Sequence, residues 1–329
     1  MNLRLYDDQR KMLIYEIEHP EAYFMDGAIK ESSVDMADQI GGGSFHEVLF
    51  DGVHIAYGSA RLLQSLRFGF ESDYETVEMH FALKGKNTSF SDAFDQKIRF
   101  EPHTHNIIYA NGMNGEMEWE NNELQIFEIN LAPSFFKRFL VDEHLAFSNF
   151  RDAIEGGRSA LLYQQHRPMN REMYDIIEQI MGCQRSGVFK RMFLEAKVIE
   201  LLLLQLEQFS DDRFARLSLK KNDIEKIYAV REFIVQNLDS NCSLIDLAHQ
   251  AGTNDFVLKK GFKELFGTTV FGFWNDKKME QAKKLLTEQD FNVGEVSTII
   301  GYKNQRHFST AFKKKFGVLP NEMKKTYYS

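Results

Sequence analysis

Alternating apolar and polar residues dominate the chain between residues 47 and 131. Apolar side chains at every second position from Val77 to Leu83 have the period of a half-buried β-strand. Asp51-Gly52 and Gly58-Ser59 interrupt the apolar segment 47–62 and predict turns there. Further strands are predicted over 97–101, 105–112, 115–120 and 124–131. Short strands at this regular spacing indicate an antiparallel β barrel or sandwich.

The pattern becomes helical after residue 132. Apolar residues at spacings of three and four predict a helix over 170–184 and a longer one from Gly187 to about Phe209. The main apolar face of the longer helix holds Phe189, Met192, Phe193, Ala196, Ile199, Leu203 and Leu206. Because Leu201, Leu202 and Leu204 lie off that face, this helix must be covered on more than one side. Two interpretations stay open: burial within the domain, or a subunit interface that includes Ile199, Leu202, Leu203 and Leu206.

One pattern occurs twice between Ser243 and Pro320: a short apolar helix, a glycine, a basic amphipathic helix and Phe-Gly. The copies are SLIDLAHQAGTNDFVLKKGFKELFG and NVGEVSTIIGYKNQRHFSTAFKKKFG. Gly252 and Gly301 provide the tight turn that a helix-turn-helix unit needs. The segment 273–287 between the copies predicts one stiff spacer helix of roughly 20–25 Å. This part of the chain is therefore predicted to be all-helical, with two helix-turn-helix units.

The distribution of charge differs between the two parts of the chain. The 329 residues carry a net charge of −8, which by itself argues against a nucleic-acid partner. Residues 222–329, however, hold 16 Lys and Arg against 13 Asp and Glu, whereas residues 1–221 hold 24 against 35. This asymmetry is typical of a DNA-binding module joined to an acidic control domain.

The remaining composition indicates a packed protein of a reducing compartment. The hydrophobic fraction of 43% is ample for apolar cores. The two cysteines, Cys183 and Cys242, have neither the spacing of a disulfide framework nor that of a zinc site. The acidic N-terminal segment lacks the apolar core of a signal peptide, and the apolar run 201–204 is far shorter than the ~20 residues of a membrane span. We expect a cytoplasmic protein without a membrane partner.

Two segments of the N-terminal part suggest ligand chemistry. His103-Thr104-His105 has the spacing of two metal ligands on one barrel strand, but no Glu follows at the expected distance. We therefore expect ordinary strand-edge histidines and no metal. Gly41-Gly42-Gly43 lacks the strand-to-helix context of a phosphate loop and predicts a flexible turn. Aromatic residues such as Phe90 and Phe94 could line a small-molecule pocket, although burial in the core is the commoner role.

The C-terminal third of the chain resembles the DNA-binding domain of the AraC/XylS family of bacterial transcription regulators. The resemblance rests on LAHQAG followed ten residues later by Phe262, on KM..A..LL in the spacer helix and on GY…F…AFKKKFGVLPNE near the end. The last of these segments matches the family signature. The N-terminal part is loosely similar to the family's effector domains, which are often cupin-like barrels followed by helices that dimerise.

The resemblance implies a regulator that binds double-stranded promoter DNA as a homodimer, contacts RNA polymerase and responds to a small-molecule effector. It implies no catalytic residue and no cofactor. The residues implied to contact DNA are Phe256, Lys259, Lys260, Lys263, Gln305, Arg306, His307, Ser309, Lys313 and Lys314. Gln305 and Arg306 are the candidates for base edges, and the lysines for phosphate, with a solvated helix face as the alternative.

Two residues depart from the family pattern. Gly261 interrupts the first recognition helix and costs roughly 1 kcal/mol of helix stability. Ser297 replaces the usual alanine in the second copy. We interpret the first copy as an anchor and the second as the one that recognises sequence.

The expected fold is α+β and multidomain. A cupin-like antiparallel barrel or sandwich (1–150) senses the effector, a helical region (151–215) connects or dimerises, and an all-α domain (216–329) binds DNA. One alternative is a cupin-type metal-dependent enzyme with a DNA-binding tail, supported by His103 and His105 alone. Another is an architectural DNA-binding protein with an empty barrel, which predicts little sequence preference.

Overall fold

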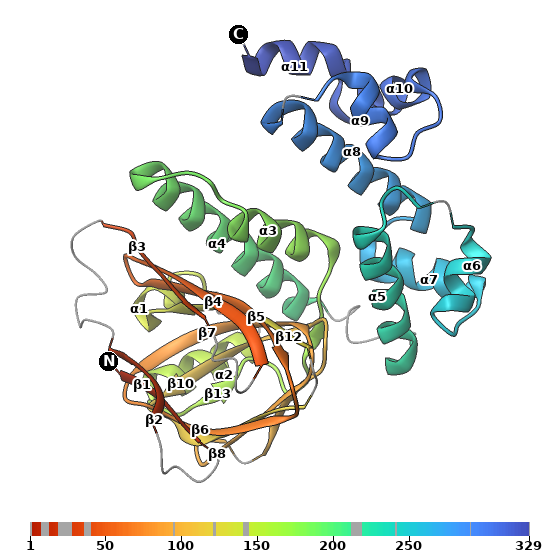
Figure 1. The fold of residues 1–329 in the computed structure, drawn as a ribbon. Coiled ribbons are helices and arrows are strands. Elements are labelled where there is room, and N and C mark those ends of the chain that lie inside the picture. Colours follow the sequence, from red (N-terminus) through yellow and green to blue (C-terminus); the bar gives the residue numbers. More distant parts are fainter. Residues whose placement is uncertain are drawn as a thin grey trace. The chain divides into compact units, whose positions relative to one another are not determined.

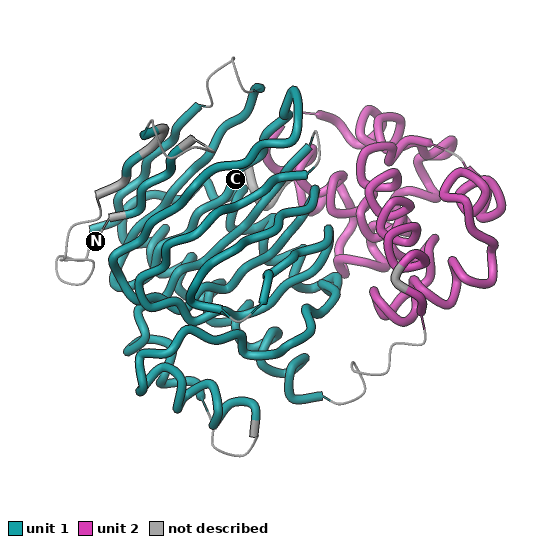
Figure 2. The backbone as a smooth tube through the Cα atoms, turned by 90° about the horizontal axis from the view of Figure 1, so that it is seen from below, with its two compact units in different colours: residues 1–216 teal, residues 217–329 magenta. Residues whose placement is uncertain are grey.

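The chain divides into two compact units in the computed structural model (Figure 2). Residues 1–216 form unit 1 and residues 217–329 form unit 2. Buried apolar side chains occur in both, as expected of separate domains. The described residues are 2–7, 13–18, 28–35, 41–94, 96–120, 123–140, 145–211, 219–240, 242–289 and 291–328. Most of the polar segment 210–222, where we expected the domain boundary, lies outside them.

Unit 1 contains two antiparallel β-sheets (Figure 1). Sheet A has the strand order β2-β1-β6-β11-β8-β9, and sheet B has the order β13-β10-β7-β12-β5-β4-β3, with β14 also paired to β10. The strands are β1 (Asn2–Asp7), β2 (Leu13–Glu18), β3 (Lys30–Asp35), β4 (Gly41–Phe50), β5 (Val53–Leu62), β6 (Leu66–Ser72), β7 (Glu75–Lys84), β8 (Asn87–Ser91), β9 (Ile98–Phe100), β10 (Thr104–Asn111), β11 (Asn114–Trp119), β12 (Glu123–Leu131), β13 (Ala160–Leu161) and β14 (Arg167–Pro168).

The two sheets pack face to face and enclose a largely apolar interior. Phe68 and Trp119 of sheet A pack with Leu124 of sheet B, and Phe100 of sheet A packs with Ile108 of sheet B. The predicted antiparallel barrel or sandwich is therefore confirmed. The expectation that the central strands are half-buried is wrong, because β7 is covered on both faces and buried at most of its positions.

Two glycine-containing segments that predicted turns lie inside strands. The run 41–43 begins β4, and a Cβ on Gly43 would lie 2.3 Å from the carbonyl oxygen of Ser59 on β5. Gly58 lies within β5, where a Cβ would lie 2.3 Å from the ring of Phe45. At both places glycine permits close approach of neighbouring groups. Composition alone does not distinguish this role from a turn.

Helices follow the strands and cover the outer face of sheet B (Figure 1). They are α1 (Pro133–Lys137), α2 (Leu145–Glu155), α3 (Arg171–Met181) and α4 (Gly187–Ser210). The predicted helices over 170–184 and 187–209 correspond to α3 and α4. The short strands β13 and β14 come after residue 150, so the sheet extends into the region that we expected to be helical.

The structure shows which side of α4 packs within unit 1, a point that the sequence left open. The buried residues of α4 are Leu194, Val198, Leu201, Leu202, Gln205, Gln208 and Phe209. Phe189, Met192 and Leu203 of the main apolar face are 73%, 60% and 52% exposed. Leu202, which we expected at a subunit interface, is 1% exposed and packs within unit 1. That assignment of Leu202 is wrong.

The regular elements among the described residues of unit 2 are all helices. Its helices are α5 (Lys221–Gln236), α6 (Leu244–Gln250), α7 (Asp255–Phe266), α8 (Val270–Glu288), α9 (Val293–Ile299), α10 (Gln305–Phe316) and α11 (Pro320–Tyr328). One core joins Met279 and Leu286 of α8 to Val296 of α9 and to Phe308 and Phe312 of α10. Among the described helices of the chain, none is long and apolar enough to cross a membrane.

Candidate nucleic-acid interface and barrel interior

Each helix-turn-helix unit begins with a capped helix and turns at a glycine. Ser243 and Asn292 begin α6 and α9, and each forms a capping box with the acidic residue three positions later. Gly252 has a φ of 65° and Gly301 a φ of 80°, which side-chain-bearing residues adopt only with strain. The two predicted turn glycines therefore lie where the backbone requires them, directly before α7 and α10.

The predicted DNA-contacting residues of α7 are on its exposed side. They are Phe256, Lys259, Lys260 and Lys263. Phe256 is 70% exposed, which is unusual for so large an apolar side chain. Lys259 Nζ lies 2.9 Å from a carboxylate oxygen of Asp255, and Lys263 Nζ donates to the carbonyl oxygen of Gly267 at 3.0 Å. These surface contacts are weak, so the lysines remain able to bind phosphate.

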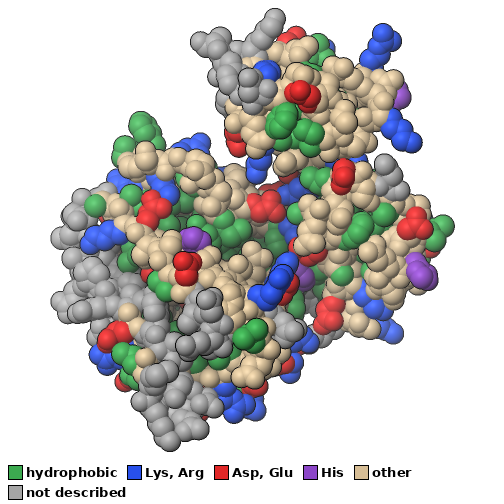
Figure 3. All heavy atoms as spheres, viewed as in Figure 1, with side chains coloured by type: hydrophobic (Ala, Val, Ile, Leu, Met, Phe, Trp, Pro, Cys, Tyr) green, Lys and Arg blue, Asp and Glu red, His purple; other side chains and the backbone are tan. Residues whose placement is uncertain are grey.

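The predicted residues of α10 also face solvent, apart from the half-buried Ser309. The exposed ones are Gln305, Arg306, His307, Lys313 and Lys314. The side chain of Asn304 caps the helix by accepting a hydrogen bond from the backbone N–H of Arg306 at 2.8 Å. Arg306 is thus in the first turn, the part of a recognition helix that meets base edges. Figure 3 shows Lys, Arg and His side chains projecting from unit 2 near α10.

Gly261 has a packing role that the sequence did not reveal. It is buried on the side of α7 that faces α5, and a Cβ there would lie 1.8 Å from Cδ1 of Ile227. The absent side chain lets the two helices approach closely. The expectation that Gly261 only weakens the first recognition helix omitted this contact.

Two family models match the chain. The helix-turn-helix domain matches residues 247–326, and the regulatory protein PchR N-terminal domain matches residues 43–219, which is more than half of the chain. The chain belongs to the AraC/XylS family, with an N-terminal domain of the PchR type.

Named relatives of this AraC/XylS member match parts of it. The regulatory protein PchR of Pseudomonas aeruginosa is 31% identical over 128 residues, which cover 38% of this chain and 43% of the relative. The arabinose operon regulatory protein of Escherichia coli is 24% identical over 163 residues, covering 49% and 53%. The chain thus spans about half the length of these curated relatives. The C-terminal domain of AraT, a response regulator from Geobacillus stearothermophilus, is 27% identical, with a TM-score of 0.30, covering 31% of this chain and 84% of that one.

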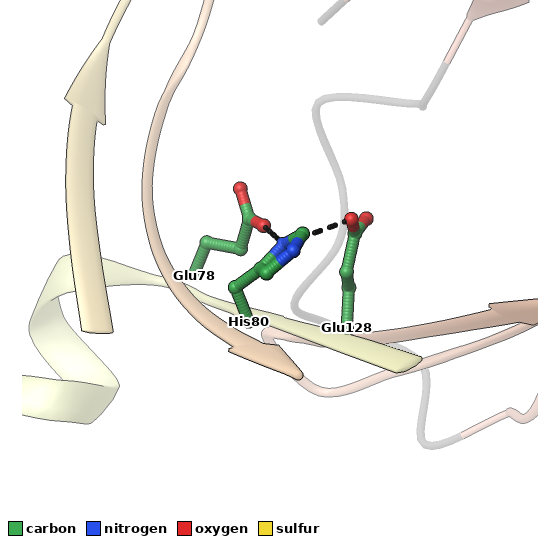
Figure 4. Close-up of side chains that lie close together, drawn as sticks. All are labelled: Glu78, His80 and Glu128. Atoms are coloured by element: carbon green, nitrogen blue, oxygen red, sulfur yellow. Dashed lines mark hydrogen bonds and ion pairs between the residues drawn. The ribbon is translucent and has the colours of Figure 1, made fainter. Parts of the chain in front are cut away.

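The barrel interior of this AraC/XylS member contains a polar cluster that the sequence analysis missed. His80 of β7 lies between two carboxylates, with Nδ1 2.7 Å from Oε1 of Glu78 and 3.1 Å from Oε1 of Glu128 (Figure 4). Burial alone lowers the pKa of His80, but the two carboxylates outweigh it and raise the pKa to about 10. His80 is therefore an imidazolium at neutral pH. The sequence contains only the pair Glu78-x-His80 as a signal of this cluster. Such a pair is equally typical of the solvent-facing side of a strand, so it did not indicate a buried site.

The two histidines that suggested metal ligands face the helices, away from the barrel interior. His103 lies in the turn before β10, and its Nδ1 is 2.6 Å from the hydroxyl of Tyr174 on α3. His105 Nε2 donates to Oε1 of Gln208, and the side-chain amide of Gln205 donates to His105 Nδ1 at 2.9 Å. Both ring nitrogens of His105 and Nδ1 of His103 are therefore engaged in hydrogen bonds within the protein. The two histidines lie at the start of β10, where they are buried and bonded to residues of α3 and α4, so the enzyme alternative loses its supporting observation.

A pocket of about 420 Å³ lies beside sheet A, away from both histidine sites. Its lining residues are Phe90, Ser91, Asp92, Phe94, Gln96, Lys97, Asn114, Gly115 and Glu116. Phe90 and Phe94 were among the aromatic residues considered for a ligand pocket. Others of that group, such as Phe68 and Trp119, are buried between the sheets.

Proposed function

We propose that this chain is a sequence-specific DNA-binding transcription regulator. The observation that supports it most directly is the pair of helix-turn-helix units, each with a recognition helix whose polar side chains face solvent. The spacer α8 has 19 residues and is therefore about 28 Å long. This length approaches the ~34 Å turn of B-DNA, which suits insertion of α7 and α10 into successive segments of the major groove.

Selection of bound duplexes from a random DNA pool tests this proposal with the full-length protein. We expect enrichment of one sequence that has two conserved blocks about one helical turn apart, because two linked recognition helices contact one face of the duplex. Recovery of unrelated sequences with equal affinity would contradict sequence-specific binding and favour the architectural alternative.

Arg306→Ala is expected to weaken binding to the selected duplex roughly tenfold, because a guanidinium that contacts a guanine edge contributes specificity. Binding to a random duplex should change much less. Lys314→Ala is the matched control, since loss of a phosphate contact weakens binding to both duplexes alike. Fluorescence anisotropy at fixed salt measures all four affinities. Equal losses for Arg306→Ala on the two duplexes would exclude a role in base recognition.

We further propose that two copies pair through the exposed face of α4. The face consists of apolar residues at alternating spacings of three and four: Phe189, Met192, Ala196, Ile199, Leu203 and Leu206. This is the spacing of a coiled-coil seam, in which apolar side chains of two helices interlock. Several large apolar side chains exposed along one face of a helix commonly mark a protein–protein contact. In such a homodimer four recognition helices would be available to the promoter.

Leu203→Glu is expected to shift the protein from dimer to monomer by more than tenfold in the dissociation constant, because it places a charge in the middle of the seam. The domain should still fold, since Leu203 is already half-exposed. Leu63→Glu, on a side chain that is 74% exposed elsewhere in unit 1, is the matched control. Light scattering over a range of concentrations gives the mass. A dimer equally stable in both variants would place the contact elsewhere.

The remaining parts of the proposal concern the effector and the polymerase. We propose that unit 1 binds a small-molecule effector, because its two sheets enclose polar groups in an otherwise apolar interior. Binding there would change the population of DNA-competent states without any catalytic step. We also propose that the protein contacts RNA polymerase, as the family resemblance implies, and reconstituted transcription from a promoter carrying the selected sequence tests it.

A further inference from the structure

We propose that Glu78, His80 and Glu128 bind a divalent transition-metal ion inside the barrel of unit 1. One ligand atom from each side chain lies within 4.8 Å of the others (Figure 4). The distances from His80 Nδ1 to the two carboxylate oxygens are 2.7 and 3.1 Å. Ligand atoms that sit ~2.1 Å from one ion are themselves roughly 3 Å apart, so the three groups need little movement to share an ion.

The sheet itself fixes the three side chains. Glu78 and His80 are two positions apart on β7 and therefore project from the same face. Glu128 on β12 is the direct cross-strand partner of His80. Ligands on paired central strands are held more firmly than ligands on loops, which is what a metal site of defined geometry requires.

The surroundings of the cluster supply the other features of a metal site. The side-chain amide of Asn87, from sheet A, lies 3.4 Å from His80 Nε2 through its Nδ2. With its oxygen turned toward the ring, this amide would accept the Nε2–H of an imidazole that binds the ion through Nδ1, which is the role of an outer partner. The side chain of His80 is 5% exposed, whereas those of Glu78 and Glu128 are 17% and 23% exposed. The histidine thus forms the base of the site, and the carboxylates provide the side by which an ion or a further ligand approaches.

The ligand set indicates the class of ion. Carboxylates alone would suit Mg²⁺ or Ca²⁺, and thiolates would suit Cu⁺, whereas a mixture of imidazole and carboxylate suits Mn²⁺, Fe²⁺, Co²⁺ or Zn²⁺. Binding of an ion through Nδ1 requires His80 to release one proton to solvent. Two carboxylates and the resulting neutral imidazole then balance the charge of a divalent ion, which lowers the cost of burying the acidic groups. The inference concerns unit 1 alone and does not depend on the proposed binding of DNA.

Titration with Co²⁺ tests the site in the full-length protein after treatment with a chelator. We expect one Co²⁺ per chain, with visible absorption bands of nitrogen and oxygen ligation. Glu78→Gln and Glu128→Gln keep the side-chain volume and should weaken binding by about 100-fold or more, because loss of an outer partner already costs ~10–100-fold. Glu118→Gln, at a partly exposed carboxylate of sheet A that pairs with Arg67, is the matched control and should bind Co²⁺ as the wild type does.

Two results would overturn the proposal. One is wild-type protein that takes up no Co²⁺ at micromolar concentration, which would leave the cluster as a closed ion triad. The other is unchanged binding in both glutamine variants. Circular dichroism shows whether these variants fold. Should they not fold, anomalous diffraction at the cobalt edge on wild-type crystals decides: a peak among the three side chains supports the site, and peaks confined to exposed histidines overturn it.

Discussion

Lowering the pH from 6.5 to 4.5 is expected to destabilise unit 1 by roughly 2 kcal/mol through His105 alone. Burial under α4 lowers the pKa of His105 to about 3, and the neighbouring His166 and Arg167 act in the same direction. In this window the unfolded chain, with a histidine pKa of ~6.5, binds a proton that the folded protein excludes. Stability from His105 is therefore complete above pH 6.5 and is lost as the pH falls toward 3.

Two other histidines of unit 1 must be considered with it. His166 is also buried, and its pKa is lowered to about 4, so it adds to the acid sensitivity. His80 has the opposite sign. Its pKa of about 10 contributes stability that is complete below pH 6.5 and is lost only as the pH rises through 10. Among these three histidines, only His105 and His166 therefore lower the free energy of unfolding as the pH falls from 6.5 to 4.5.

Urea unfolding followed by tryptophan fluorescence measures this effect unit by unit, because Trp119 lies in unit 1 and Trp274 in unit 2. His105→Gln, which cannot titrate, should remove roughly 2 kcal/mol of the acid-induced loss at Trp119. The same substitution should leave the acid-induced change at Trp274 unaltered, because His105 lies in unit 1. An identical pH profile in wild type and His105→Gln would show that His105 is not held neutral.

Gly261→Ala is expected to destabilise unit 2 by about 2–3 kcal/mol, at the upper end of the cost of overpacking a core. Helix propensity by itself predicts the opposite sign, a gain of roughly 1 kcal/mol. The steric clash outweighs this gain, because the new Cβ would lie 1.8 Å from Cδ1 and 2.7 Å from Cγ1 of Ile227, a fully buried side chain. Urea unfolding followed at Trp274 measures the change.

A compensating variant separates the collision from other causes. Ile227→Val removes Cδ1, so the double variant should recover more than 1 kcal/mol relative to the sum of the single changes. Gly294→Ala in α9 is the matched control, since its Cβ would meet no atom closer than 3.2 Å. A stabilised Gly261→Ala variant would show that α5 and α7 separate without cost, and the packing role of Gly261 would be rejected.

The regular elements could be predicted from the sequence because their periods are strong, whereas the direction of α4 could not. The sequence left open which side of α4 is buried within the domain, and the main apolar face did not include the polar Gln205 and Gln208. In the structure they are buried because His105 offers each of them a hydrogen-bonding partner. A helix with apolar residues on two faces gives no local signal for which face packs inside, and the partner lies about 100 positions away in the chain.

The two candidate sites also differ in whether a local sequence pattern or a distant partner determines them. Arg306 and the turn glycines follow from a local repeat, so their positions relative to α10 and α7 could be predicted. The cluster around His80 depends on the register of β7 against β12, which brings Glu128 beside a residue 48 positions earlier. The alternation of apolar and polar residues along β7 places Glu78 and His80 on one polar face of the strand. That face lies inside the barrel only because sheet A packs against it.

The two faces of α4 make the proposed pairing of subunits and the state of the barrel thermodynamically reciprocal. Gln205 and Gln208 bind His105 on one face, and Leu203 lies on the other, so a shift of β10 on effector binding would be passed through α4 to the proposed seam. If the effector changes the dimerisation constant by a given factor, dimerisation changes the affinity for the effector by the same factor. The apparent affinity for that molecule then depends on the concentration of the protein itself, which makes the abundance of the regulator part of its own sensitivity.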